Sequence, residues 1–176
     1  MAGGIPVGPA ARHFEDFEVG AEFRTQGRTV TDIEGMHWAM FTGDMNPMHV
    51  DNDFATKHGL FGGRFPPGLM VVAIASGLNE RMGLFAGTGL AMLGQTIRYR
   101  KAVVPGDTVH VELTVRSLEP RPRRSAGIVE FGYEIVTGDG TVAIEGEWTM
   151  LLASSSTTSE TIETKEPSAE ATSTQQ

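Results

Sequence analysis

The sequence predicts an α+β domain in which an antiparallel sheet wraps around one buried helix. The longest apolar run of the chain, residues 69–75, directly follows Pro66, Pro67 and Gly68 and indicates that helix. The second half of the chain alternates apolar and polar residues in four segments, as half-buried strands do. Consecutive strands joined by short turns favour an antiparallel sheet, and the apolar helix needs that sheet to cover it.

We expect this domain over residues 14–153, between a flexible Gly/Pro-rich arm over residues 1–13 and a disordered tail over residues 154–176. The tail is mostly Ser, Thr, Glu and Ala, with almost no bulky apolar residue. It cannot bury enough apolar surface to offset the entropy lost on ordering.

A first helix is expected to begin after Thr31 and to end at Gly43. Thr31 and Glu34 have the spacing of a capping box, in which each residue satisfies a backbone donor of the other. Residues 33, 36 and 40 are apolar and recur at helical spacing. Gly43 suits the left-handed residue that closes a helix.

The second helix is expected to begin with Pro67 as its first residue and to run to about Met82. Proline is favourable at a first helical position because its missing N–H would have had no helical partner. Residues 69–75 are apolar nearly all round the helix, so we expect burial on most sides.

Four strands follow the helices. Their apolar positions place them within residues 90–101, 108–118, 127–137 and 142–152. Turn-forming residues separate these segments, and each join resembles a hairpin. The three joins lie at residues 105–107, 120–124 and 138–140.

Composition excludes several classes of function. The chain has no cysteine, which excludes disulfides, thiolate metal sites and a cysteine nucleophile. Its net charge of −8 argues against a nucleic-acid partner, because phosphate binding requires basic surface. The apolar run is too short to span a membrane. The first residues lack the basic and apolar regions of a signal peptide, so we expect a cytoplasmic protein.

The segment from Phe41 to His49 holds the strongest candidate site. On an uninterrupted helix, Asp44 and His49 would lie roughly 140° apart and could not share a target. Gly43 and Pro47 interrupt the helix and force a sharp turn, in which the two side chains can converge. An Asp–His pair on one water is a general acid/base device. The alternative is an Asp that caps a turn and a structural loop histidine.

The chain resembles the MaoC-like, (R)-specific enoyl-CoA hydratase family of the hot-dog fold over about residues 14–152. Three motifs carry the resemblance: Thr42-Gly43-Asp44-x-Asn46-Pro47-x-His49, Gly62-Gly63-Arg64-x-x-Pro67-Gly68 and Val103-x-Pro105-Gly106-Asp107-Thr108. The resemblance implies that water adds reversibly across the 2,3 double bond of an enoyl-CoA to give an (R)-3-hydroxyacyl-CoA. It also implies a homodimer or a dimer of dimers, with the active site close to the dimer interface.

Under this resemblance, Asp44 and His49 are the acid/base pair, and either could be the base. Asn46 orients His49 or holds the turn. Gly68 is the candidate oxyanion donor, because Pro66 and Pro67 have no N–H and the helix start carries the positive end of the dipole. We expect neither a metal nor a cofactor, since CoA is part of the substrate.

Four basic residues are candidates for the phosphates of CoA: Arg64, Arg98, Arg100 and Lys101. The alternative is that these residues belong to a solvated strand edge. The single short domain favours short or medium acyl chains.

Two other functions remain open. A hot-dog thioesterase would attack the carbonyl carbon instead of C3, and the intact Asp44 and His49 pair disfavours it. A non-catalytic acyl-CoA-binding subunit of a hydratase complex would be expected to carry a degraded motif, whereas here the motif is whole.

Overall fold

The structure is a computed structural model, and it describes residues 11–155. Most of the predicted arm and tail therefore lies outside the described residues. The first half contains η1 (Phe14–Asp16), β1 (Glu22–Arg24), β2 (Arg28–Thr29), α1 (Asp32–Thr42), α2 (Pro47–Val50), α3 (Asn52–His58) and α4 (Gly68–Arg81). The second half contains β3 (Gly89–Tyr99), β4 (Thr108–Arg121), η2 (Pro122–Arg124), β5 (Ala126–Thr137) and β6 (Val142–Ala153).

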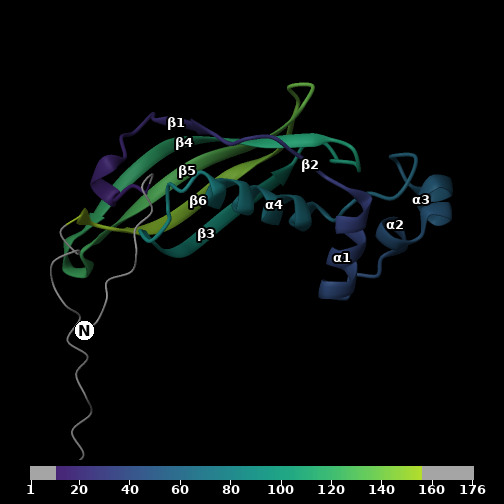
Figure 1. Cartoon of the computed structure of the whole chain (residues 1–176), viewed down its shortest axis with the longest axis horizontal. Helices are drawn as coiled ribbons and strands as arrows, with labels where there is room; N and C mark the ends of the chain where they lie inside the picture. Colours follow the sequence, from purple (N-terminus) through teal and green to yellow (C-terminus); the bar gives the residue numbers. More distant parts are fainter. Residues whose placement is uncertain (1–10, 156–176) are drawn as a thin grey trace, which may run out of the picture.

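The strands form one antiparallel sheet in the order β1-β4-β5-β6-β3, with β2 also paired to β4. The sheet is strongly twisted and curves around α4, which lies along its inner face (Figure 1). The predicted α+β class, with a sheet wrapped around one long helix, is confirmed. None of the helices within residues 11–155 is long and apolar enough to cross a membrane.

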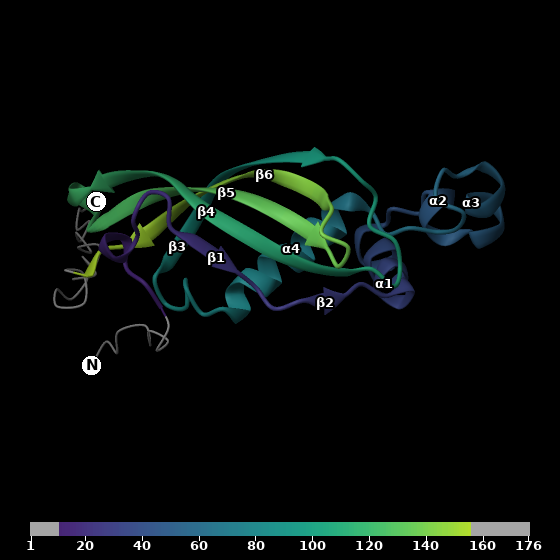
Figure 2. The ribbon, with the colours of Figure 1, turned by 90° about the horizontal axis from the view of Figure 1, so that it is seen from above.

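The join at residues 105–107 is not a hairpin, and that prediction was wrong. β3 pairs with β6, whereas β4 pairs with β5 and with the short strands β1 and β2. Residues 100–107 therefore carry the chain past the end of the sheet, from the edge strand β3 to β4 on the far side of β5 and β6 (Figure 2). Alternation marks each strand but carries no signal for its neighbours, and β1 and β2 are too short to show it.

The core lies between α4 and the inner face of the sheet. α4 contributes Met70, Val71, Ile74 and Leu78, each less than a tenth exposed. The central strands contribute alternating buried residues, including Val109, Val111, Leu113, Phe131, Ile135, Ile144 and Trp148. The buried residues of α4, 70–72, 74, 75, 78 and 79, take up about two-thirds of its circumference, so the predicted burial on most sides is confirmed. Residues 69, 73, 76, 77 and 80 form an exposed stripe on the remaining side.

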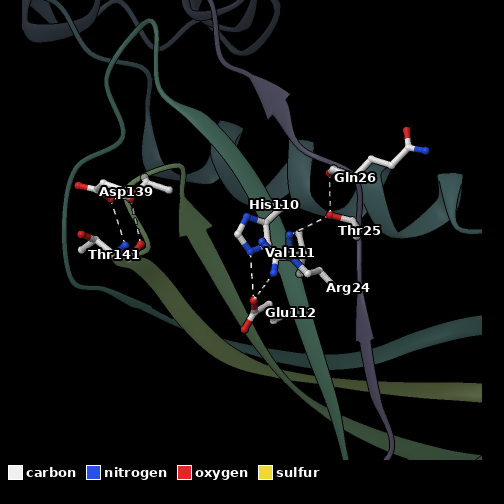
Figure 3. Close-up of polar contacts among 9 residues, drawn as sticks. Arg24, Thr25, Gln26, His110, Val111, Glu112, Asp139 and Thr141 are labelled. Atoms are coloured by element: carbon white, nitrogen blue, oxygen red, sulfur yellow. Dashed lines mark hydrogen bonds and ion pairs between the residues drawn. The ribbon is translucent and has the colours of Figure 1, made fainter.

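The outer face of the sheet is polar. Figure 3 shows His110 and Glu112 of β4 lying together beside Arg24 of β1. Nε2 of His110 is 3.1 Å from the Glu112 carboxylate, and Nη1 of Arg24 is 3.8 Å from it. Beyond the end of β1, the hydroxyl oxygen of Thr25 accepts the Val111 N–H at 2.9 Å and continues the pairing (Figure 3). The sheet therefore buries its α4 side and solvates the other.

The helix boundaries follow from local chemistry. The N–H and hydroxyl of Thr31 donate to the Glu34 carboxylate at 2.9 and 2.8 Å, and α1 begins at Asp32 as predicted. Gly43 closes α1 with a φ of 76°, in the left-handed region. α4 begins one residue later than predicted. Pro67 has an extended ψ of 138° and is the N-cap, so Gly68 is the first helical residue.

Candidate active site

The candidate site lies where residues 43–67 leave the body of the domain and return to it. This excursion carries α2 and α3, which lie beyond the end of the sheet near α1 (Figure 2). Gly43 turns the chain out of α1, and Asn46 then caps α2 by accepting the Met48 N–H at 3.0 Å. Pro47 is the first residue of α2. The sharp turn was predicted, but the helical turn that carries His49 was not.

Asp44 and His49 converge as the spacing suggested. Oδ2 of Asp44 is 3.9 Å from Nε2 of His49. That distance exceeds a direct hydrogen bond, yet one water can contact both atoms. The Asp44 side chain is 45% exposed and that of His49 is 11% exposed. One group therefore faces solvent, and the other is set into the protein.

Phe65 orients the imidazole of His49, which sequence reasoning missed. Nδ1 of His49 is 2.7 Å from the carbonyl oxygen of Phe65. A carbonyl only accepts, so Nδ1 must carry the hydrogen, and in a neutral ring Nε2 keeps its lone pair toward Asp44. The Phe65 ring also packs edge-on against the imidazole, with ring centroids 5.0 Å apart. A backbone carbonyl leaves no residue-type signal, so no motif pointed to Phe65.

Asn46 holds the turn instead of touching the imidazole. Its side-chain oxygen accepts from the Met48 N–H, and its carbonyl accepts the His49 N–H at 2.8 Å. Both bonds fix the backbone that carries His49. Of the two roles considered for Asn46, the contacts are those of the turn.

A pocket of about 840 Å³ opens between the excursion, α4 and the end of β3. Asp44, His49 and Gly68 all line it. Its other walls are mainly apolar: Trp38, Phe61, Phe65, Pro66, Pro67, Leu69, Val71, Tyr99, Val103 and Ile144. Such a cavity, with few polar groups converging on one region, is typical of a site for a largely apolar ligand.

The start of α4 supplies an unused donor in this pocket. Pro66 and Pro67 have no N–H, and the Gly68 N–H donates no hydrogen bond within the described part of the chain. The positive end of the helix dipole lies at the same place. Gly68 is therefore positioned to donate to a developing negative charge in the pocket.

The predicted basic residues go to three different places. Arg100 and Lys101 line the pocket, whereas Arg98 lines a hollow on the outer face of the sheet. The Arg100 guanidinium is 2.5 Å from the Glu145 carboxylate, and this hydrogen bond holds the pKa of Glu145 below its usual value. Nζ of Lys101 is 3.2 Å from Asp139.

Asp139 belongs to the β5–β6 turn and is itself well held. Its carboxylate accepts the Thr137 hydroxyl at 2.6 Å and the Thr141 N–H at 3.1 Å, the latter visible in Figure 3. The Thr137 hydrogen bond is the main reason that the pKa of Asp139 lies well below its ordinary value. Lys101, which lines the pocket, is thus paired with a carboxylate that two hydrogen bonds of the β5–β6 turn hold in place.

Arg64 does not line the pocket and serves to tie the excursion together. Its guanidinium forms an ion pair with Asp32 at the start of α1 and donates to the Val50 carbonyl at 3.3 Å. These contacts occupy the group that was predicted to reach CoA phosphates. In residues 11–155 no three His, Asp or Glu side chains gather as metal ligands would.

Comparison with known proteins identifies the family. The model of the MaoC-like domain matches residues 16–139. This chain belongs to the MaoC-like domain family. Over 115 residues the MaoC-like chain is 36% identical to a 3-hydroxybutyryl-CoA dehydratase of Methylorubrum extorquens, covering 64% of this chain and 69% of the relative. It is 29% identical over 141 residues to an (R)-specific enoyl-CoA hydratase of Rhodospirillum rubrum, covering 80% and 91% of the two chains.

A solved structure agrees with the family. A MaoC-like dehydratase from Rhodospirillum rubrum superposes with a TM-score of 0.73 and 28% identity, over 81% of this chain and 97% of that one. The fold of the MaoC-like chain is the hot-dog fold, in which the sheet curves around one long helix. The recognised family and fold class are thereby confirmed.

Proposed function

We propose that this MaoC-like protein reversibly hydrates a 2-enoyl-CoA thioester to an (R)-3-hydroxyacyl-CoA. The relatives named above are hydratases and dehydratases, which supports hydro-lyase chemistry, and one of them is (R)-specific by name. The observation that carries the proposal is the 3.9 Å gap between Asp44 and His49, in the same pocket as the free N–H of Gly68. That arrangement supports a reaction in which water activation and oxyanion stabilisation act on one acyl group.

In the proposed reaction, one water lies between Oδ2 of Asp44 and Nε2 of His49. Nε2 accepts a proton as the water oxygen bonds to C3, and the electrons of the C2–C3 double bond move onto the thioester oxygen. The Gly68 N–H stabilises that charge. The imidazolium, stabilised by the Asp44 carboxylate, then returns the proton to C2. Water has been added, both side chains are restored, and no oxidation state has changed.

The carrier of the acyl group is proposed to be CoA. Arg100 and Lys101 border the pocket and are paired with Glu145 and Asp139, so incoming phosphates would compete with these carboxylates. The apolar walls of the pocket, which include Trp38 and Ile144, would hold the acyl chain. Hydration by this route requires neither a metal nor a redox cofactor.

A homodimer is proposed through the edge strand β3. This strand exposes Leu90, Met92 and Leu93, each about half accessible, together with unpaired backbone groups along one edge. Long apolar edge strands invite pairing with another chain. Sedimentation that gives the mass of a monomer would contradict the dimer.

The function is tested by adding purified protein to crotonyl-CoA and following the enoyl-thioester absorbance. We expect bleaching by the wild type, with a loss of about 10²–10⁴-fold in Asp44→Asn and in His49→Ala, as for general acid–base groups. Asp53→Asn and His58→Ala are matched controls, because they change the same residue types on α3 outside the pocket. Both should keep wild-type activity.

Product analysis then separates the alternatives. Chiral chromatography should show the (R)-3-hydroxy product. Free thiol without loss of the double bond would identify a thioesterase, and binding without turnover over a panel of enoyl-CoAs would identify a non-catalytic subunit. Either of these results would contradict the proposal.

A further inference from the structure

Backbone conformation does not explain why position 68 is a glycine. Its φ is not positive, so the backbone there would accept any residue. Glycine is also among the poorest residues for a helix. The constraint is spatial: a Cβ at this position would lie 2.4 Å from Cε1 of Tyr99 and 2.9 Å from its Cζ. The tyrosine ring therefore lies directly against the first residue of α4.

Tyr99 reaches this place from a different part of the fold. It is the last residue of β3 and pairs in register with Ile144 of β6, whose side chain is in the core. Because directly opposite residues of neighbouring strands share a face of the sheet, Tyr99 lies on the α4 side as Ile144 does. Tyr99 lines the pocket together with Gly68, and the residue as a whole is 51% exposed.

We propose that the Tyr99 ring forms one wall of the oxyanion site, where it shields the Gly68 N–H from water. Position 68 is a glycine because a Cβ there would collide with this ring. This inference rests on the proposed hydratase function. The ring lies against Gly68, the first residue of the Pro66-Pro67-Gly68 start with an N–H to offer a thioester oxygen. It keeps water from that side of Gly68, so the hydrogen bond from the N–H to the developing charge acts in a less polar surrounding. Hydrogen bonds to a transition-state charge are worth more where water is excluded.

The contact is made by ring carbons, and this sets the prediction apart from a role for the hydroxyl. The three Tyr99 atoms nearest to the Gly68 Cβ position are Cε1, Cζ and Cδ1. Burial raises the pKa of Tyr99, so the phenol stays neutral and adds no charge to the site. Tyr99 acts here as a positioning residue, through the environment of the Gly68 donor.

Steady-state hydration of crotonyl-CoA tests the wall. Tyr99→Ala should lower kcat by about tenfold or more with little change in KM, because only the transition state carries the charge. Tyr99→Phe should keep most of the kcat that Tyr99→Ala loses. Tyr99→Leu, which retains apolar bulk, serves if the alanine variant does not fold by circular dichroism, and it should fall between the two.

A spectroscopic readout separates this role from a merely structural one. Crotonyl-CoA labelled with ¹³C at C1 is bound to Asp44→Asn protein, in which turnover is slow, and its carbonyl stretch is measured by difference infrared spectroscopy. The stretch should shift to lower frequency on binding, and the shift should shrink in Asp44→Asn/Tyr99→Ala but persist in Asp44→Asn/Tyr99→Phe.

Each other outcome overturns the inference. If Tyr99→Ala has the kcat of an active wild type, the ring does not shield the oxyanion site. If only KM rises, Tyr99 binds substrate uniformly, and if Tyr99→Phe loses as much as Tyr99→Ala, the hydroxyl acts instead. A wild type that hydrates no enoyl-CoA refutes the proposed function itself, and with it the inference. The wild-type assay alone therefore distinguishes the two failures.

Discussion

Replacing Gly68 with alanine should destabilise this protein, although the same change stabilises most helices. In a helix interior, alanine is favoured over glycine by about 0.8–1 kcal/mol. The new methyl carbon would lie 2.4 Å from Cε1 of Tyr99, far inside ordinary van der Waals contact. The ring must therefore move off the start of α4, or the start of α4 must shift.

The magnitude follows from two opposing terms. Overpacking of this kind costs about 1–3 kcal/mol, and the helix preference returns at most about 1 kcal/mol. The difference lies between about 0 and 3 kcal/mol, and its middle, a net loss of about 1–2 kcal/mol, corresponds to a fall in Tm of about 2–8 °C for a domain of this size. In a Tyr99→Ala background the methyl group has room, so the sign should reverse and Gly68→Ala should stabilise.

Urea unfolding at a fixed protein concentration measures both backgrounds, with the midpoint read at constant m value. Gly77→Ala is the matched control in the same helix, because a Cβ there meets nothing within 4 Å. It should stabilise by up to about 1 kcal/mol. A Gly68→Ala variant that is as stable as Gly77→Ala, or that loses equally with and without Tyr99, would refute the contact.

Two further predictions concern the turn and the core. Asn46→Ala removes the cap of α2, worth about 0.5–2 kcal/mol locally, and should lower kcat for crotonyl-CoA because His49 is carried on that turn. Asn46→Asp keeps an acceptor and should keep most of the activity, whereas equal kcat values in Asn46→Ala and wild type would contradict the role. Burial raises the pKa of Tyr133 to about 12, while the unfolded value is 10.0. A raised pKa contributes stability below pH 10 that is lost as pH rises toward 12, so the urea midpoint should fall in that window and fall less in Tyr133→Phe.

The turn that holds the proposed acid/base pair could be predicted from consecutive residues. Gly43, Asn46 and Pro47 act through backbone conformation and hydrogen bonds that reach only two or three positions along the chain. Thr31 and Glu34 mark the start of α1 in the same way. Such features are readable because both partners stand side by side in the sequence.

Strand order and the partners of the site residues needed the tertiary structure. Alternation located β3 to β6 but gave no reason for β3 to pair with β6 instead of β4. The same limit applies to three basic residues that lie close together in the sequence. Arg98 faces the outer side of the sheet, whereas Arg100 and Lys101 line the pocket, and the sequence pattern did not distinguish between these places.

By itself, the sequence indicated the groups that we propose for the chemistry: a carboxylate, an imidazole and a helix start whose first N–H belongs to Gly68. Only the folded chain decided how they are held. The Phe65 carbonyl sets the tautomer of His49 from sixteen positions away, and Tyr99 lies on Gly68 from thirty-one positions away. Such contacts depend on packing between distant segments, and no pattern of neighbouring residues encodes them.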